Sequence, residues 1–328
     1  MKAVVWMEYG PPEGLQLKEV QKPDPKENEV LVKIHATTVT AGDCEMRRLE
    51  LPLFFSTPMR VFNGLRAPKR ITVLGQELAG EIEAVGEGVK SFKPGERVFA
   101  TTGFNLGGYA EYICLPEGAE DIALAKMPAN MTFDEAAAVP FGGLESLHFL
   151  RRANIQKGQQ LLINGAGGSI GTFGVQLAKH FGAEVTAIDS AGKLEMLRSI
   201  GADHVIDYTR QDFTTSGVKY DVIFDVIGKS PFSGSIRSLE ESGYFLMANP
   251  RISYMLRGLW VSKRSSKKVV SGTAPQRSED LNYLKELIEA GHLRTVIDRT
   301  YQLEQTAEAH RYVETGAKQG NLIIKVSP

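Results

Sequence analysis

Two kinds of hydrophobic pattern divide the chain. In the first 123 residues, short segments such as 30–36 and 79–86 alternate apolar and polar side chains, and the turn-forming residues at 86–88 and 93–96 separate them. Alternation with a period of two residues is typical of half-buried β-strands. This part of the chain is therefore predicted to form a compact, partly open β-barrel.

Beyond residue 127, apolar segments of strand length alternate with helical patterns. Thr132 and Glu135 form a capping-box sequence, which predicts a helix from 133 to 138. The strand-like segments that follow are 161–164, 185–188, 205–206, 222–225, 244–248 and, at a sheet edge, 268–271. Such alternation predicts a doubly wound parallel sheet, so the fold class is α/β.

The segment 161–174 joins a predicted strand, a glycine-rich turn and a predicted helix. Glycines allow the backbone to turn tightly and to approach a pyrophosphate, while the N–H groups at the helix start attract its negative charge. The next strand ends at Asp189, 18 residues after Gly171, near the roughly 20-residue spacing of an acid that binds ribose. The segment therefore predicts a dinucleotide site, with candidate residues Gly165, Gly168, Ser169, Ile170 and Gly171.

Length and composition limit the other possibilities. The 328 residues suggest about two domains, and the 42% of hydrophobic residues can build large cores. The net charge of −1 predicts no bulk attraction to nucleic acid or membranes, and Cys44 and Cys114 are too few for a disulfide framework. We recognise neither a signal-peptide pattern nor an apolar run of 18 residues, so we expect a cytoplasmic protein.

Motifs along the whole chain resemble the medium-chain dehydrogenase/reductase superfamily, and within it the zinc-free quinone oxidoreductase-like branch. The matching segments are 9–12, 40–43, 75–80, 108–112, 138–140, the glycine-rich turn, 201–208 and 320–324. The resemblance implies a GroES-like domain formed by residues 1–123 and 291–328, with a Rossmann domain at 124–290. It also implies an active site in the cleft between them and a homodimer paired through sheet edges, near 268–271.

The resemblance allows the zinc ligands of the zinc-dependent relatives to be placed on this sequence. Thr40 occupies the first ligand position with Asp43 three residues later, Gln76 replaces a histidine, and residues 140–141 stand where a thiolate is expected. A catalytic zinc needs three ligands from Cys, His or carboxylate side chains. Since only Glu77 could coordinate, we expect no metal.

NADPH is the expected cofactor, with NADH as the alternative. Ser190, Lys193 and Tyr208 match positions that bind the 2′-phosphate of NADPH in quinone oxidoreductase-like relatives. Asp189 favours a free ribose hydroxyl and would repel that phosphate unless it is turned away or offset by Lys193. Lys193 could instead be an ordinary solvated lysine at a helix start. Asn249 and Asn321 complete the predicted cofactor-binding set.

Without zinc, conjugated acceptors are favoured because a quinone or an enone spreads the incoming charge over several atoms. We predict an NAD(P)H-dependent quinone or enone oxidoreductase, with Thr40, Asp43 and Gln76 lining the pocket. A structural role stays open for each: Asp43 could brace its turn, and Gln76 could bind backbone. Two alternatives remain, a zinc-free alcohol or carbonyl dehydrogenase and a non-catalytic NADPH-binding module that senses redox state.

Two segments combine cations with large apolar side chains. Residues 47–70 contain six cations and one acid, and residues 251–268 contain six cations and no acid. A lid with solvated cations is one interpretation. Weak peripheral contact with an anionic membrane surface, where a lipophilic quinone could be collected, is the other.

Overall fold

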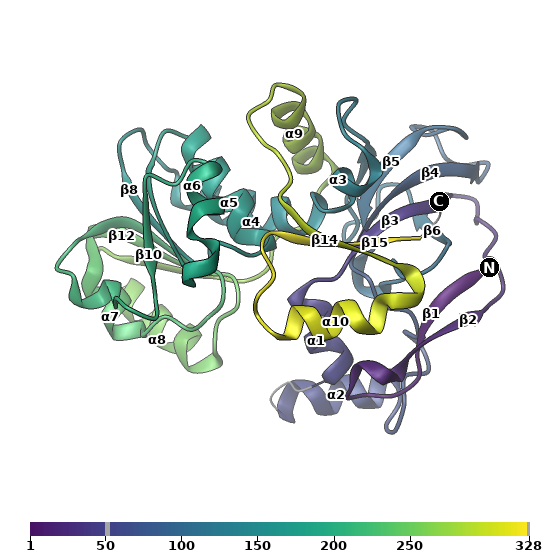
Figure 1. The fold of residues 1–328 in the computed structure, drawn as a ribbon, viewed down its shortest axis with the longest axis horizontal. Coiled ribbons are helices and arrows are strands. Elements are labelled where there is room, and N and C mark those ends of the chain that lie inside the picture. Colours follow the sequence, from purple (N-terminus) through teal and green to yellow (C-terminus); the bar gives the residue numbers. More distant parts are fainter. Residues whose placement is uncertain (50–52, 327–328) are drawn as a thin grey trace. The chain divides into compact units, whose positions relative to one another are not determined.

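The computed structural model describes residues 1–49 and 53–326, which form two compact units (Figure 1). The first, called the barrel unit below, comprises residues 1–141, 276–289 and the chain from 295 onward. The second, called the sheet unit, comprises residues 142–275 and 290–294. Both are built around β-sheets, and the fold class is α/β as predicted.

The barrel unit contains a seven-stranded sheet in which β14 pairs in parallel with β15 and the other neighbours are antiparallel. Its order is β14 (Ile297–Gln302), β15 (Asn321–Lys325), β3 (Glu29–Thr38), β4 (Glu77–Val85), β5 (Arg97–Thr101) and β7 (Leu124–Lys126), with β6 (Tyr112–Pro116) also on β3. A separate pair joins β1 (Lys2–Trp6) to β2 (Leu15–Glu19). The alternation predicted for 30–36 is observed, because Val30, Val32 and Ile34 are all fully buried in one core.

Short helices close the barrel unit. They are α1 (Ala41–Arg48), α2 (Leu53–Asn63), α3 (Phe133–Ala137), α9 (Ser278–Glu289) and α10 (Thr306–Glu314), with single 3₁₀ turns at Pro12–Gly14, Gly103–Asn105 and Leu303–Gln305. The predicted capping box is confirmed at α3, where the Thr132 hydroxyl accepts from Glu135 N–H and the Glu135 carboxylate accepts from Thr132 N–H. Residues 50–52 of the first cationic segment lie outside the described residues.

The sheet unit is a six-stranded, wholly parallel sheet. Its order is β10 (His204–Asp207), β9 (Glu184–Asp189), β8 (Gln160–Asn164), β11 (Tyr220–Asp225), β12 (Leu239–Met247) and β13 (Lys268–Ser271). The first strand of this sheet along the chain, β8, therefore lies between β9 and β11, the strand order of dinucleotide-binding folds. The edge position predicted for 268–271 is confirmed.

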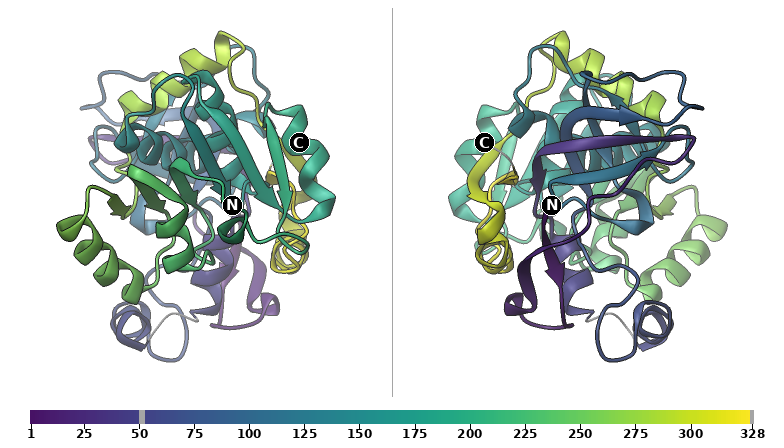
Figure 2. Two further views of the ribbon diagram at one scale, coloured as in Figure 1. Left: turned by 90° about the vertical axis from the view of Figure 1, so that its left-hand side faces the viewer. Right: turned by 90° about the vertical axis from the view of Figure 1, so that its right-hand side faces the viewer.

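Five α-helices accompany this sheet: α4 (Pro140–Ala153), α5 (Ser169–His180), α6 (Leu194–Ser199), α7 (Phe232–Ser238) and α8 (Ile252–Arg264), with 3₁₀ turns at Ala191–Lys193 and Phe213–Thr215. Figure 1 and the left view of Figure 2 place α7 and α8 together at the end of the sheet formed by β12 and β13. None of the helices in the described ranges is both long and apolar enough to cross a bilayer.

The two units divide the chain differently from the predicted boundaries at 123 and 291. Residues 124–141 and α9 belong to the barrel unit, because hydrogen bonds tie them to one another. Ser278 Oγ accepts from Leu124 N–H at 3.1 Å, and Asn130 Nδ2 donates to the Ile288 carbonyl at 3.0 Å. These contacts join segments about 150 residues apart in the chain, which sequence patterns do not reveal.

Candidate nucleotide-binding and catalytic site

The loop between β8 and α5 forms a tight turn. Gly165 has a φ of +83°, in the left-handed region that glycine adopts without strain. Its N–H donates to the Ile188 carbonyl of β9 at 3.0 Å, so the turn is fixed to the neighbouring strand. A Cβ at this position would lie 2.5 Å from the Ile227 side chain. The loop after β11 therefore packs directly on the turn.

Gly171 and Gly168 are glycines for different reasons. A Cβ on Gly171 would lie 2.4 Å from the Gly165 carbonyl oxygen, so only glycine lets the helix approach the turn this closely. Gly168 is the N-cap of α5 with a φ of −94°, and the nearest atom to a Cβ there is 3.8 Å away. Ser169 and Ile170, both half-buried, begin the helix. Space above Gly168, at the N-terminus of a 12-residue helix, fits an anionic pyrophosphate.

Asp189, at the end of β9, is held against the turn. Its Oδ2 accepts from Gly167 N–H at 2.8 Å, and its Oδ1 accepts from Ser190 N–H at 2.8 Å. The Lys193 ammonium lies 3.2 Å from Oδ1. Lys193 is only 8% exposed, so it is not an ordinary solvated lysine. The negative charge of Asp189 is thus offset by the Lys193 ammonium. This is one of the two arrangements in which Asp189 was not expected to repel the 2′-phosphate of NADPH.

The other predicted residues of the 2′-phosphate site surround Asp189. Tyr208 follows β10, its N–H donates to the Asp189 carbonyl at 3.2 Å, and its side chain is 59% exposed. Ser190 is half-buried. Together with Lys193, these groups form a polar cluster at the carboxyl ends of β9 and β10, the edge at which parallel sheets of this type bind ligands.

The two predicted asparagines lie in different units. Asn249 is exposed and follows β12 in the sheet unit, where Gly228, with a φ of +66°, approaches it so closely that a Cβ would lie 2.0 Å from the Asn249 carbonyl oxygen. Asn321 belongs to β15 of the barrel unit, is 1% exposed and donates through Nδ2 to the Val296 carbonyl at 3.2 Å. Asn249 thus lies at the carboxyl edge of the sheet, and Asn321 inside the barrel unit.

A buried network around Asp225 was not predicted as part of the site. Asn164 Nδ2 donates to Asp225 Oδ1 at 3.0 Å and to Ser230 Oγ at 2.9 Å. The N–H groups of Gly228 and Ser230 each donate to the Asp225 carboxylate at 3.1 Å. The network joins the ends of β8 and β11 and so fixes the loops beside the glycine turn. An acid at the end of a predicted strand was the only signal in the sequence.

In the barrel unit, the structure brings Thr40, Asp43 and Gln76 together. Gln76 Nε2 donates to Thr40 Oγ1 at 3.1 Å, and Thr40 Oγ1 donates to Asp43 Oδ2 at 2.7 Å. Thr40 is the N-cap of α1 and forms a capping box with Asp43. The missing side chain of Gly42 admits the amide, because a Cβ there would lie 2.6 Å from Gln76 Nε2. The three predicted residues therefore form one hydrogen-bonded chain.

The Asp43 carboxylate connects two segments of the barrel unit, the start of α1 and the loop before Gln76. Besides capping α1, its Oδ1 accepts from Gly75 N–H at 3.2 Å, which ties the loop before Gln76 to the helix start. The side chain is fully buried, and this burial raises the pKa of Asp43 above its ordinary value. Thr40 is 3% exposed, and Gln76 is half-buried. Gln76 is therefore the most accessible of the three.

Glu77 was the one side chain at the expected zinc site that could coordinate a metal. Both of its carboxylate oxygens accept hydrogen bonds. Oε1 accepts from Thr38 Oγ1 at 2.5 Å, and Oε2 accepts from Phe141 N–H at 2.7 Å. The side chain is fully buried, and burial raises its pKa to about 7. Glu77 therefore links β4 to the first turn of α4 rather than presenting a free carboxylate.

Cys44 likewise does not match a zinc ligand. It is 2% exposed, its Sγ lies 3.3 Å from His310 Nδ1, and burial raises its pKa to about 12. On the other side of the ring, His310 Nε2 lies 3.1 Å from the Tyr109 hydroxyl, and burial lowers the pKa of His310 to about 3. Zinc binds cysteine as the thiolate, and the ion must be able to reach the sulfur. The raised pKa keeps the Cys44 thiol protonated, and its burial closes it off. Among the described residues, no group of three or more His, Cys, Asp and Glu side chains could hold a metal, and the side chains at the expected positions do not fit zinc.

Comparisons with known proteins find relatives that match the chain along nearly its whole length. One family model, the alcohol dehydrogenase GroES-like domain, matches residues 26–129, and a second, described as a zinc-binding dehydrogenase, matches residues 200–324. The chain is 32% identical to a 2-methylene-furan-3-one reductase of Solanum lycopersicum, over 100% of this chain and 80% of the relative. It is 31% identical to a chloroplastic NADPH-dependent alkenal/one oxidoreductase of Arabidopsis thaliana, with the same coverage of 100% and 80%. Escherichia coli quinone oxidoreductase, solved in complex with NADPH, is similar with a TM-score of 0.83 and 26% identity, over 99% of this chain and 100% of that one.

Proposed function

The chain belongs to the quinone oxidoreductase-like branch of the medium-chain dehydrogenase/reductase superfamily, and from this membership we propose that it transfers hydride from NADPH to a quinone or an α,β-unsaturated carbonyl without zinc. The observation that carries the proposal is the hydrogen-bonded chain of Gln76, Thr40 and Asp43. The sequence resemblance aligns Thr40 and Gln76 with metal-ligand positions of the zinc-dependent relatives, and these side chains are neutral hydrogen-bonding groups instead of zinc ligands.

The sheet unit would hold the nucleotide. The space above Gly168 and the start of α5 would receive the pyrophosphate. Lys193, Ser190 and Tyr208 would bind the 2′-phosphate, since they gather around Asp189 at the carboxyl edge of the sheet. When bound, the nicotinamide ring supplies the hydride. The relatives named for NADPH support this choice over NADH.

The barrel unit would support the acceptor. An enone or a quinone distributes the arriving negative charge over a conjugated system, so a few hydrogen bonds can stabilise it where a simple aldehyde needs a Lewis acid. The Gln76 amide, half-buried and held beside Thr40, is suited to donate such a bond. Asp43 would act as a positioning residue, because it is enclosed and fixes both Thr40 and the loop before Gln76.

Zinc independence is supported by the chemistry of the side chains present. Thr40 and Gln76 are not zinc ligands, the Glu77 oxygens are engaged by Thr38 and Phe141, and the Cys44 thiol is buried against His310. The free thiols of Cys44 and Cys114 also support the cytoplasm, a reducing compartment, as the place of action.

We further propose that two copies pair through β13. This strand lies at the sheet edge and pairs with β12 as its only neighbour in the described sheet. An edge strand presents backbone donors and acceptors that a second strand can pair with. Val269 N–H donates to Ser262 Oγ and so points away from β12, and Ser271 N–H points the same way because donors alternate along a strand. Light scattering on the wild type and on a variant with Ser271→Pro, which removes this outward donor, would test the arrangement.

A panel of acceptors tests the proposed reaction. NADPH and NADH oxidation would be followed with a quinone, a 2-alkenal and a simple aldehyde, and the metal content of the same preparation would be measured. We expect NADPH oxidation with the first two acceptors and less than one zinc in ten subunits. Turnover of the aldehyde alone would favour an alcohol or carbonyl dehydrogenase. Tight nucleotide binding without turnover of any acceptor would favour a redox-sensing module.

A further inference from the structure

Helix α8 packs on β13 of the sheet unit through the side of the helix that carries Gly258. Gly258 is the buried residue of this helix, and a Cβ there would lie 2.6 Å from the Val269 Cγ1 of β13. Tyr254 and Val261, on the same side, pack on the core of the sheet unit. Because a helix turns by about 100° per residue, this contact fixes which side chains point outward.

The outward side of α8 is apolar and exposed. It consists of Ile252, Met255, Leu256, Leu259 and Trp260, called the α8 face below, with exposed fractions of 37%, 41%, 64%, 62% and 57%. Single exposed apolar residues are ordinary on protein surfaces, but five on one helix face are not. A cluster of this kind marks a surface that contacts another apolar surface, such as a protein or a membrane.

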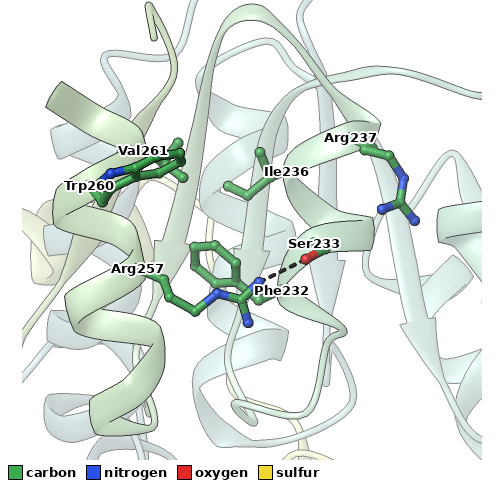
Figure 3. A pocket seen from close by; sticks show the side chains of 7 residues that line it. All are labelled: Phe232, Ser233, Ile236, Arg237, Arg257, Trp260 and Val261. Carbon is green, nitrogen blue, oxygen red and sulfur yellow. Dashed lines mark hydrogen bonds between the residues drawn. The ribbon is translucent and has the colours of Figure 1, made fainter. Parts of the chain in front are cut away.

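Cations border the α8 face. The Arg264 guanidinium lies over the Trp260 ring at 4.8 Å, and Lys263 is exposed in the same turn. Arg257 lies over the Phe232 ring at 4.3 Å and donates to Ser233 Oγ at 2.7 Å. Figure 3 shows Arg257 extended from α8 toward α7 in this way. From 251 to 268 the sequence contains no acid, so no carboxylate of this segment neutralises them.

A groove adjoins this face. It lies between α7 and α8 (Figure 3), and its lining residues are Phe232, Ser233, Ile236, Arg237, Arg257, Trp260 and Val261. Its lining thus combines four apolar side chains with one hydroxyl and two guanidinium groups. This combination matches an acyl chain whose anionic headgroup lies next to a guanidinium.

We propose that the α8 face and the adjoining groove dock on a bilayer surface that contains anionic phospholipids. An amphipathic helix with Trp and Leu on one side and Arg and Lys at the border lies flat in such an interface. A second copy of the chain is a poor occupant, because a twofold contact through this face would bring together two segments that each contain six cations and no acid. A free phosphate is also a poor one, because it would leave the five apolar side chains uncovered. The full-length enzyme would thereby be held where lipophilic acceptors are dissolved.

The chain contains its own reporter for this contact. Of its two tryptophans, Trp6 is 1% exposed and Trp260 is 57% exposed. Insertion of the α8 face should therefore shift the fluorescence of Trp260 to shorter wavelength, with a constant background from Trp6. The variant Trp260→Phe should show no shift.

The test is flotation of the full-length protein with vesicles of phosphatidylcholine alone or with 30% phosphatidylglycerol, together with the fluorescence shift. We expect binding to the anionic vesicles that falls with added salt. The double variant Leu256→Glu/Leu259→Glu should weaken it at least tenfold, and Lys263→Glu/Arg264→Glu should do so by about tenfold or more. The control Leu17→Glu alters a 38% exposed leucine on β2 of the barrel unit and should leave binding unchanged. Unfolding midpoints within a few degrees of wild type would establish that the variants fold.

Three results would overturn the proposal. The first is no flotation with anionic vesicles. The second is flotation that the α8 variants leave unchanged. The third is a change of subunit number in the α8 variants without a change in flotation, which would make the face a contact between copies.

Discussion

The ammonium of Lys193 lies 3.2 Å from the carboxylate of Asp189, and each side chain is only 10% exposed. The same carboxylate accepts hydrogen bonds from the N–H groups of Gly167 and Ser190. An acid at the end of the second strand is commonly taken as a sign of NADH, because it repels a 2′-phosphate. Here the acid is part of a nearly neutral, enclosed pair, so it does not by itself argue against NADPH.

Substitutions on the two sides of this pair should move the nucleotide preference in opposite directions. Asp189→Ser removes the negative charge and frees Lys193, so NADPH should bind more tightly relative to NADH. Lys193→Ala removes the cation and should weaken NADPH by about tenfold, which is about 1.4 kcal/mol. Fluorescence titration with both nucleotides measures the ratio.

Lys179→Ala is the matched control for Lys193→Ala. Lys179 also forms an ion pair, with Asp203 at 2.7 Å, and lies in the same unit, but away from the predicted 2′-phosphate residues in sequence. It should leave the ratio unchanged. NADPH affinities that stay at the wild-type value in both Asp189→Ser and Lys193→Ala would contradict the assignment.

Two alanine substitutions in the glycine turn should have separate effects. Gly168→Ala meets no atom closer than 3.8 Å, so stability should change by no more than about 0.5 kcal/mol. The added methyl group would enter the space assigned to the pyrophosphate, and the Kd of NADPH should rise about tenfold or more. Gly171→Ala places a Cβ 2.4 Å from backbone and should cost about 1–3 kcal/mol of stability. Calorimetry and nucleotide titration on both variants measure this contrast, which would be absent if Gly168 did not face the ligand.

Glu77 should make stability depend on pH. Its pKa is raised from 4.5 to about 7, so the folded protein binds this proton more tightly than the unfolded chain does. The contribution is fully present below about pH 4.5 and is lost as the pH rises through about 7. Between pH 5 and pH 8 the loss should be about 2 kcal/mol.

Glu77→Gln tests this prediction, because an amide can keep a hydrogen bond with Thr38 and still accept from Phe141 N–H. Urea unfolding between pH 5 and pH 8 should show a flatter profile in the variant than in the wild type. Glu145, whose pKa is also raised to about 7 by burial, should retain its own share of the slope. Parallel profiles for the variant and the wild type would refute the prediction.

The role of Thr40 can be separated from its capping bond. Thr40 and Thr132 form the same capping box in α1 and α3, so Thr40→Val and Thr132→Val should each cost about 1 kcal/mol of stability. Only Thr40→Val should lower kcat with an enone, because it also releases the Gln76 amide. Equal kcat values in the two variants would assign Thr40 a capping role alone.

Gln76 is the residue whose loss should affect turnover most directly. Gln76→Leu keeps the approximate volume and removes the amide donor, so kcat/KM with a 2-alkenal should fall about tenfold or more. The Kd of NADPH should not change, since Gln76 belongs to the barrel unit and the residues predicted to bind the nucleotide, Asn321 apart, belong to the sheet unit. Steady-state rates combined with nucleotide titration distinguish the two effects.

Local patterns were sufficient to predict much of this molecule. The run 161–164 followed by glycines and a helix repeat identifies β8 and α5, because each signal lies within a few residues of the next. The edge strand at 268–271 and the capping box of Thr132 and Glu135 follow from equally local rules, and all three are observed.

Contacts between distant parts of the chain could not be predicted in this way. The barrel unit recruits α9 through Ser278 and Asn130, and Cys44 lies against His310, which is 266 residues away in the chain. The bracing of Gly75 by Asp43 also depends on how two loops pack. The family resemblance therefore grouped Thr40, Asp43 and Gln76 at one predicted site, but only the structure gives the order of their hydrogen bonds.

Isotope transfer tests the proposed reaction most directly. The enzyme would be given a 2-alkenal and NADPH deuterated at the transferable position, with metals removed by a chelator, and the product would be examined by NMR. We predict one deuterium at the β-carbon of a saturated aldehyde, with the α-hydrogen taken from solvent. Deuterium on the carbonyl carbon of an allylic alcohol, or turnover that returns only when zinc is added, would contradict it.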